Sequence, residues 1–154
     1  MNDSAKVWVY QSSREFTPGE VVELTNVLTG FIDGWQAHGA DLSADFQLVE
    51  NRFIVLLVDE TKSSASGCSI DSSVGLIRDI EIKYELNLTD KGQVAFWLNN
   101  KIKVITFKEI KSTIEAGEIT RDSIIFNNSV ANYKEYKENW QVAAKDSWMK
   151  RYFS

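Results

Sequence analysis

One short segment in the first half of the chain limits the possible folds most strongly. Residues 53–58 are apolar at every position, and the acidic pair Asp59 and Glu60 follows them directly. A run that is apolar at every position is typical of a central strand covered on both faces. We therefore predict that this segment forms the central strand of a sheet. We also predict that the loop at the end of this strand carries the functional residues.

The loop that follows consists almost wholly of small residues. Residues 61–67 read Thr-Lys-Ser-Ser-Ala-Ser-Gly and lead to Cys68, the only cysteine of the chain. Apolar side chains then recur at helical steps, and Ser69 or Asp71 is able to cap the start of a helix. The second half of this segment also alternates like a strand, but the available cap favours a helix over residues 70–85.

The other elements follow from the same patterns. We predict strands over residues 6–11, 45–50, 93–98 and 101–107, an extended segment over 123–126, and helices over 18–35, 109–116 and parts of 132–153. The first helix has the clearest start. Thr17 supplies a hydroxyl at the N-cap, and Glu20 completes a capping box with it. Pro18 lies at the first helical position, where proline is favoured. Asn99 and Asn100 tolerate the positive φ angles of a tight hairpin turn.

The order of these elements predicts the fold class. Strand, helix, strand, strand, helix and strand follow one another, as in the ferredoxin-like split β-α-β unit. We therefore expect an α+β fold, with a ferredoxin-like antiparallel sheet, helices on one face, an additional strand and a C-terminal helical tail. A length of 154 residues with 44% hydrophobic residues predicts a single domain over residues 1–154.

Composition and charge exclude several classes of function. No apolar run approaches the roughly 20 residues that cross a bilayer, and the polar start of the chain does not resemble a signal peptide, so we expect a cytoplasmic protein. One cysteine and one histidine cannot form a zinc cluster, and we predict no metal and no cofactor. The net charge of −5 argues against nucleic acid as a partner. A local basic strip could form at Lys101, Lys103, Lys108 and Lys111, but these lysines are more typical of an ordinary solvated face.

Cys68 and the loop before it form the candidate site. A thiol beside a helix N-terminus is favoured as the thiolate, and the amides there can hold an anion. On this interpretation the candidate ligand-binding residues are Ser66, Gly67, Ser69, Asp71 and Ser72. The alternative is that Cys68 is a small buried apolar side chain and that the serines only cap and solvate the loop.

Two further sets of side chains could belong to a functional site or could have no role beyond the structure. His38 lies in a predicted turn over residues 38–41, and it could act as the base for Cys68 if the fold brings the two together. It could equally be exposed and without a role. Asp59, Glu60 and Asp71 could bind Mg²⁺ through their carboxylates, or they could be ordinary caps and solvated strand ends.

Three short motifs resemble a known group of proteins. Gly-Cys-Ser-Ile-Asp at residues 67–71 after an apolar strand, Glu-Asn-Trp at 138–140 and Lys-Asp-Ser-Trp at 145–148 look like a family of small bacterial proteins often labelled "ABC transporter ATPase". The resemblance extends over most of the chain, and it implies no particular catalytic residue. An ABC ATPase holds nucleotide phosphates and Mg²⁺ with a G-x-x-x-x-G-K-[ST] loop, and this chain contains no such motif.

Two classes of function are therefore considered. The first is a small binding or interaction protein, which holds a small anionic ligand at residues 61–73 or a protein partner at its aromatic tail. The second is a thiol-dependent enzyme with Cys68 as nucleophile. The lack of a complete catalytic constellation favours the first.

Overall fold

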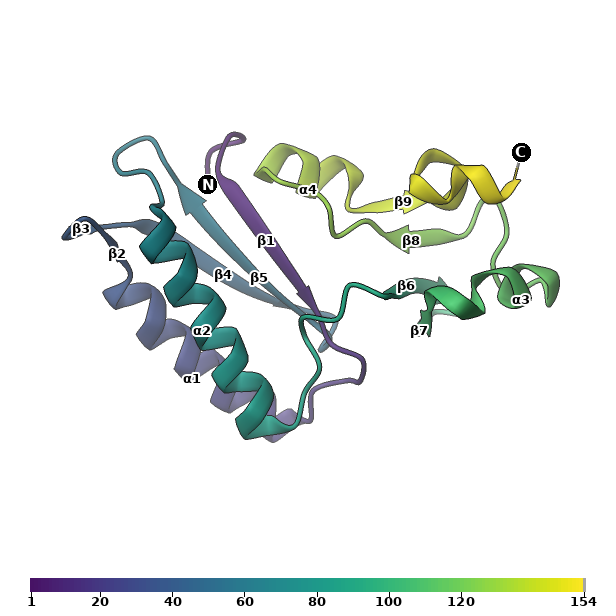
Figure 1. Cartoon of the computed structure of the whole chain (residues 1–154), viewed down its shortest axis with the longest axis horizontal. Coiled ribbons are helices and arrows are strands. Elements are labelled where there is room, and N and C mark those ends of the chain that lie inside the picture. The colour runs from purple at the N-terminus through teal and green to yellow at the C-terminus, as the bar shows by residue number, and fades with distance from the viewer. Residues whose placement is uncertain (154) are drawn as a thin grey trace. The chain divides into compact units, whose positions relative to one another are not determined.

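The computed structural model describes residues 1–153, which fall into two compact units. The first unit comprises residues 1–89 and 130–136, and the second comprises residues 90–129 and the chain from residue 137 onward. Both contain antiparallel strands and helices, so the predicted α+β class is confirmed (Figure 1). That the chain is a single domain stays a prediction.

The first unit is built on a three-stranded antiparallel sheet. Its elements are β1 (Lys6–Gln11), α1 (Pro18–Gly34), β2 (Gln36–Ala37), β3 (Ala40–Asp41), β4 (Ser43–Val49), β5 (Phe53–Asp59) and α2 (Gly67–Tyr84). The strand order is β1-β5-β4, and β2 and β3 form a separate two-stranded ribbon. Residues 53–58 of β5 are each at most 1% exposed. The prediction that this apolar run is a central strand is therefore confirmed.

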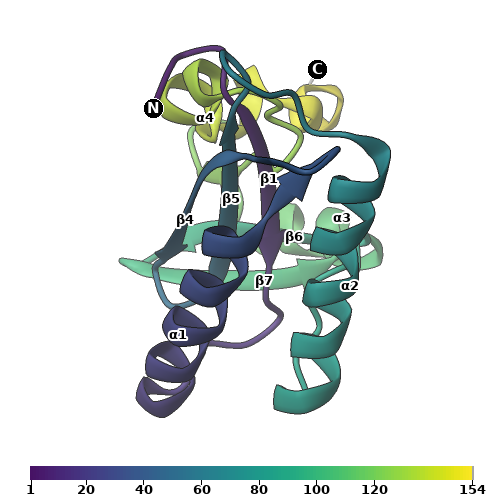
Figure 2. The same cartoon turned by 90° about the vertical axis from the view of Figure 1, so that its left-hand side faces the viewer.

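Both long helices cover the same face of this sheet, as Figure 2 shows. Side chains alternate between the faces of a strand, so Ile54 and Leu56 of β5 point to the helices. They pack against Leu24 and Leu28 of α1 and Ile77 of α2. This cluster is the hydrophobic core of the first unit.

The start of α1 is stabilised by a charged network. Thr17 Oγ1 accepts a hydrogen bond from the Glu20 amide at 3.1 Å, and Glu20 Oε1 accepts one from the Thr17 amide at 2.8 Å, so the predicted capping box is confirmed. The Arg14 guanidinium also donates to both Glu20 oxygens, at 2.8 and 2.9 Å. These bonds from Arg14 and Thr17 lower the pKa of Glu20 to about 2.

Replacing Glu20 by glutamine should lower the free energy of unfolding at pH 7 by about 1.5–3 kcal/mol, because charge-assisted hydrogen bonds are lost. A carboxylate whose pKa is lower in the folded state stabilises the fold above its unfolded pKa and loses this effect as pH falls through the folded value. The difference between wild type and Glu20→Gln should thus shrink between pH 4.5 and about 2. Urea unfolding of both proteins at a series of pH values measures this difference in the free energy of unfolding.

Glu23→Gln is the matched control, because Glu23 is exposed on the same helix. It should change stability by less than about 0.5 kcal/mol. A destabilisation by Glu20→Gln that stays constant down to pH 2 would show that the network does not depend on the ionised carboxylate.

Two hairpin turns have the backbone that their residues favour. Glu50 and Asn51 join β4 to β5 with φ angles of 52° and 53°. Asn99 and Asn100 join the next pair of strands with φ angles of 53° and 63°, as predicted. Positive φ at both central residues matches the right-handed twist of the flanking strands.

The second unit has a sheet of its own. Its elements are β6 (Gln93–Leu98), β7 (Lys101–Thr106), the 3₁₀ turn η1 (Phe107–Glu109), α3 (Ile110–Glu115), β8 (Ile124–Phe126), β9 (Gln141–Ala143) and the 3₁₀ segments η2 (Ala144–Asp146) and η3 (Trp148–Phe153). The strand order is β7-β6-β8-β9. Helix α4 (Tyr133–Asn139) contributes residues to both units.

The tail differs from the prediction of one or two amphipathic helices. It contains α4, but β9 follows, with Val142 opposite Ile125 of β8. Ala144 and Met149 are fully buried in the core that Phe96, Ile110 and other residues form. The prediction of a helix is confirmed for α4 and is wrong for residues 141–143, where sheet pairing to a distant strand outweighs local helix preference. Among the helices of residues 1–153, none has the length and apolar character that crossing a bilayer requires.

Candidate functional site

Helix α2 starts three residues earlier than predicted. Its N-cap is Ser66, whose Oγ accepts a hydrogen bond from the Ser69 amide at 3.1 Å. Ser69 Oγ in turn accepts one from the Ser66 amide at 2.7 Å. This reciprocal pair satisfies two amides, so the prediction that Ser69 or Asp71 caps the helix is wrong.

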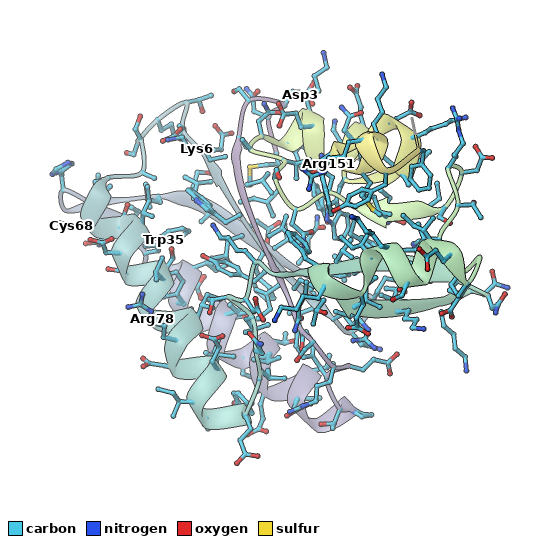
Figure 3. All side chains as sticks on the ribbon, turned by 45° about the vertical axis from the view of Figure 1, so that its right-hand side comes forward. Asp3, Lys6, Trp35, Cys68, Arg78 and Arg151 are labelled. Carbon is cyan, nitrogen blue, oxygen red and sulfur yellow. The ribbon has the colours of Figure 1, made fainter. Side chains whose placement is uncertain are left out.

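Cys68 is exposed and is the second residue of α2. The alternative that its thiol is buried in the core is therefore wrong. Its carbonyl oxygen accepts a hydrogen bond from Ser72 Oγ at 3.0 Å. Figure 3 shows Cys68 toward the start of α2, with Arg78 further along the helix. The thiol can be reached from solvent without any movement of the helix.

Two amides at the start of α2 are free donors. The first amides of any helix have no partner within the helix. Ser69 N is satisfied by the cap, and Ile70 N donates to Ser66 O at 2.9 Å. The amides of Gly67 and Cys68 have no acceptor within the part of the chain that the structure describes. They lie at the end of the helix that carries partial positive charge.

The two acidic residues after β5 hold the loop in place. Asp59 Oδ1 accepts from the Thr61 amide at 2.9 Å, and the hydrogen bonds from Thr61 lower the pKa of Asp59. Glu60 accepts from the Ala65 amide at 2.7 Å and pairs with Lys6 Nζ at 3.4 Å. Within residues 1–153 no three His, Cys, Asp or Glu side chains are grouped to hold a metal ion. The hydrogen bonds of Asp59 and Glu60 to amides of the loop fix its backbone.

A buried tryptophan, Trp35, connects the β2–β3 hairpin to the start of α2 by packing and by a hydrogen bond. Trp35 follows α1 and is 3% exposed, and its Nε1 donates to Ser69 O at 2.8 Å. Trp35 and Ala37 share an apolar cluster in which Ala65 of the loop also packs. The helix predicted over residues 18–35 included Trp35, which caps the end of α1, but no local signal could identify its partner.

His38 lies at the turn of this hairpin, with a φ of 53°, and its side chain is exposed. The hairpin strand β2 contacts α2, so the turn and the loop belong to the same end of the first unit. No hydrogen bond joins His38 to Cys68 anywhere in residues 1–153. The structure thus brings the two residues to one region without pairing them.

The other candidate side chains are largely used within the helix. Ser66 and Ser69 form the capping box, and Ser69 is 2% exposed. Ser72 donates to the Cys68 carbonyl oxygen. Asp71 is exposed on the second turn. Ser69 and Ser72 thus donate their hydroxyl hydrogens within the helix, whereas Ser66 Oγ only accepts.

Comparison with known proteins identifies no relative. No family model matches the chain, and neither a curated protein nor a solved structure matches it.

Proposed function

We propose that the first unit binds a small anionic ligand at the start of α2. The observation that carries this proposal is the pair of unpartnered amides of Gly67 and Cys68, at the N-terminal end of an 18-residue helix. Aligned peptide dipoles favour negative charge there, and free amides supply the hydrogen bonds. The loop before them is exposed at Thr61, Lys62 and Ser64, which leaves room for a ligand.

Two substitutions at Gly67 test this proposal. Gly67→Pro removes the amide hydrogen, and proline suits the first position of a helix. The extended backbone of Ser66, with φ −97° and ψ 167°, is the conformation that a following proline favours. Gly67→Ala keeps the amide, and its added Cβ meets no atom within 4 Å. The two variants therefore differ chiefly in one hydrogen-bond donor.

Calorimetric titration with inorganic phosphate at constant ionic strength gives the measurement. Gly67→Ala should bind phosphate like wild type. Gly67→Pro should bind about tenfold or more weakly, because one hydrogen bond to a charged group is lost. Equal binding by both variants would mean that the Gly67 amide does not contact the anion.

The alternative is a thiol-dependent enzyme with Cys68 as nucleophile, and the exposure of this thiol favours it. Reactive cysteines are accessible and lie in electropositive surroundings such as helix N-termini. His38 would supply the base on this proposal. Alkylation of the native protein by iodoacetamide should then slow in His38→Ala, and an unchanged rate would remove His38 from the proposal.

We extend the proposal to the arrangement of the first unit, which we regard as ferredoxin-like. The order β1, α1, β4, β5 and α2 supports this, since it follows the split β-α-β pattern. At the outer edge of β1, Asn132 bridges Lys6 in antiparallel sense, and Val7 N donates to Ala131 O at 3.1 Å. Residues 131–132 would then take the position of the fourth strand.

The chain's cellular role is part of the same proposal. We propose a cytoplasmic binding or interaction protein of the small bacterial family that its motifs resemble. A protein partner at the aromatic tail remains compatible with it, and nucleic acid is not proposed as a partner, given the net charge of −5.

The purified protein should neither bind ATP and Mg²⁺ with micromolar affinity nor hydrolyse ATP. The reason is that the chain has no G-x-x-x-x-G-K-[ST] motif, whose amides, lysine and hydroxyl hold the phosphates and the metal. Calorimetry with ATP and a phosphate-release assay check this expectation. Saturable micromolar binding would contradict it and would support the label of the similar family.

A further inference from the structure

The outer edge of β4 is the least protected sheet edge in residues 1–153. Asn132 bridges the outer edge of β1. Strands β2, β3 and β9 have only 2 or 3 residues, and β7 carries the exposed lysines Lys101 and Lys103. Short edge strands and lysines both keep a sheet edge from pairing with another chain. Strand β4 has 7 residues, contains no proline and no lysine, and pairs with β5 without a bulge.

The main-chain groups of β4 that point to this edge follow from the pairing of β5. Ser12 N donates to Arg52 O at 2.7 Å where β1 meets β5. Because hydrogen bonding alternates along an antiparallel strand, the even-numbered residues of β5 face β1 and the odd-numbered ones face β4. Odd residues of β5 lie opposite odd residues of β4. The residues of β4 that direct their N–H and C=O groups outward are therefore Ala44, Phe46 and Leu48.

These outward groups are accessible. Figure 2 shows β4 at one side of the sheet, with α1 over the sheet face and no strand beyond β4. No residue of β4 is buried, whereas residues 53–58 of β5 are at most 1% exposed. Phe46 N donates to Asp45 Oδ1 at 2.8 Å. The other outward main-chain groups of β4 have no hydrogen-bond partner within residues 1–153, so the edge can accept an added strand.

Strand β4 is complementary to itself when two copies run antiparallel with Phe46 opposite Phe46. Ala44 then lies opposite Leu48, and every outward N–H meets an outward C=O of the other copy. The side chains of these three residues lie on the face that the helices cover, where they pack in the apolar clusters of the first unit. Apolar side chains therefore also meet apolar side chains across the new strand pair.

Other registers leave outward groups unpaired. A shift by two residues places Leu48 opposite Leu42, whose amide already donates to Trp35 O at 3.0 Å. The opposite shift places Ala44 opposite Glu50, which lies in the turn with a φ of 52°. The register centred on the middle residue of β4 is thus the one that pairs all of the outward groups.

The other face of β4 adds a polar pair in the same register. Asp45 lies opposite Gln47 of the second copy, at a position without main-chain bonds between the two copies, where side chains approach most closely. Gln47 Oε1 accepts a hydrogen bond from the Tyr136 hydroxyl at 2.8 Å, and its Nε2 has no acceptor in the described chain. The Asp45 carboxylate can therefore exchange the Phe46 amide of its own chain for the Gln47 amide of the other.

We propose that β4 pairs with β4 of a second copy of this chain, antiparallel and centred on Phe46. A two-fold axis perpendicular to the sheet relates the copies, so their sheets join into one and the helices of both cover the same face. One pair of strands makes a small interface, so this dimer forms and dissociates readily. It does not depend on anion binding at the start of α2.

Sedimentation velocity of the full-length protein tests the proposal. Samples from about 10 μM to about 1 mM, at physiological ionic strength, cover the range of a weak interface. The mass should rise with concentration from 17.5 kDa toward twice that value. A protein that stays monomeric at about 1 mM would overturn the proposal.

Two substitutions on β4 identify the interface. Ala44→Pro removes an outward amide hydrogen and leaves the bonds to β5, and it should weaken the dimer about tenfold or more. Gln47→Glu places like charges opposite each other, because Asp45 of the other copy faces it, and should weaken the dimer about three- to tenfold. Adding Asp45→Lys to Gln47→Glu should restore the dimer, since opposite charges then face each other.

Asn100→Asp is the matched control for Gln47→Glu. It adds the same charge at an exposed turn of the second unit and should leave the dimer unchanged. Circular dichroism shows which variants fold, and Gln47→Glu decides if Ala44→Pro does not. A dimer that Gln47→Glu does not weaken forms through another surface. A loss that Asp45→Lys does not restore contradicts the register. Either result would overturn the proposal.

Discussion

A chain that ends at Asn128 should lose the folded structure of the second unit. The truncation removes β9, which pairs with β8, and it removes the buried residues Trp140, Ala144 and Met149. Deleting one large buried side chain costs about 2–5 kcal/mol, and a whole domain is stable by only about 5–15 kcal/mol. Circular dichroism and urea unfolding measure the loss. A truncated chain that melts within a degree or two of the full-length protein would contradict the expectation.

Two tryptophans of the tail provide the matched control for the truncation. Trp140 is 4% exposed, donates to Asn128 Oδ1 at 2.9 Å and packs edge-on against Phe126. Trp148 is 37% exposed and contacts Phe107 with 5.3 Å between ring centroids. Trp140→Ala should cost about 3–5 kcal/mol, and Trp148→Ala should cost less than about 1.5 kcal/mol. Equal costs would mean that burial does not set the contribution of the tail.

Trp35→Ala should destabilise the first unit by about 3–5 kcal/mol, since it empties a buried aromatic position. Trp35 packs with Ala37, Leu42 and Val58 and donates to Ser69 O, so it joins the β2–β3 hairpin to the start of α2. Urea unfolding measures the loss of stability. Hydrogen exchange at the amides of residues 36–41 should also become faster.

Trp35→Phe separates packing from hydrogen bonding. This variant keeps an aromatic ring and loses only the indole donor, so it should cost about 0.5–1.5 kcal/mol for the hydrogen bond and a small further amount for the reduced volume. If Trp35→Ala costs no more than Trp35→Phe, the cluster is not the anchor of the hairpin.

Local signals in the sequence predicted much of the secondary structure. The strand at Lys6–Gln11 and the strand at Gln93–Leu98 have the predicted bounds, because β-branched and aromatic runs end there at polar residues. The capping box of Thr17 and Glu20 and the Asn99–Asn100 turn also form as predicted. Each of these features depends on residues only a few positions apart.

The features that the sequence did not reveal depend on distant partners. Which strands share a sheet is set by pairing, and Phe96 of β6 lies opposite Ile125 of β8. The bond from Trp35 to Ser69 joins residues 34 positions apart. The start of α2 was predicted three residues too late for a different reason. Serine is suited both to the N-cap and to the third position of a helix, so spacing alone does not choose between Ser66 and Ser69 as the N-cap.

The free amides of α2 can be observed directly. A ¹H–¹⁵N titration of the full-length protein with inorganic phosphate, at constant ionic strength, follows the backbone signals of Gly67 and Cys68. Hydrogen bonding to an anion should shift both signals along one saturable curve, while the Ser69 amide, which the cap already satisfies, should move much less. If Gly67 and Cys68 do not shift, or shift only as they do with chloride, the start of α2 does not bind the anion.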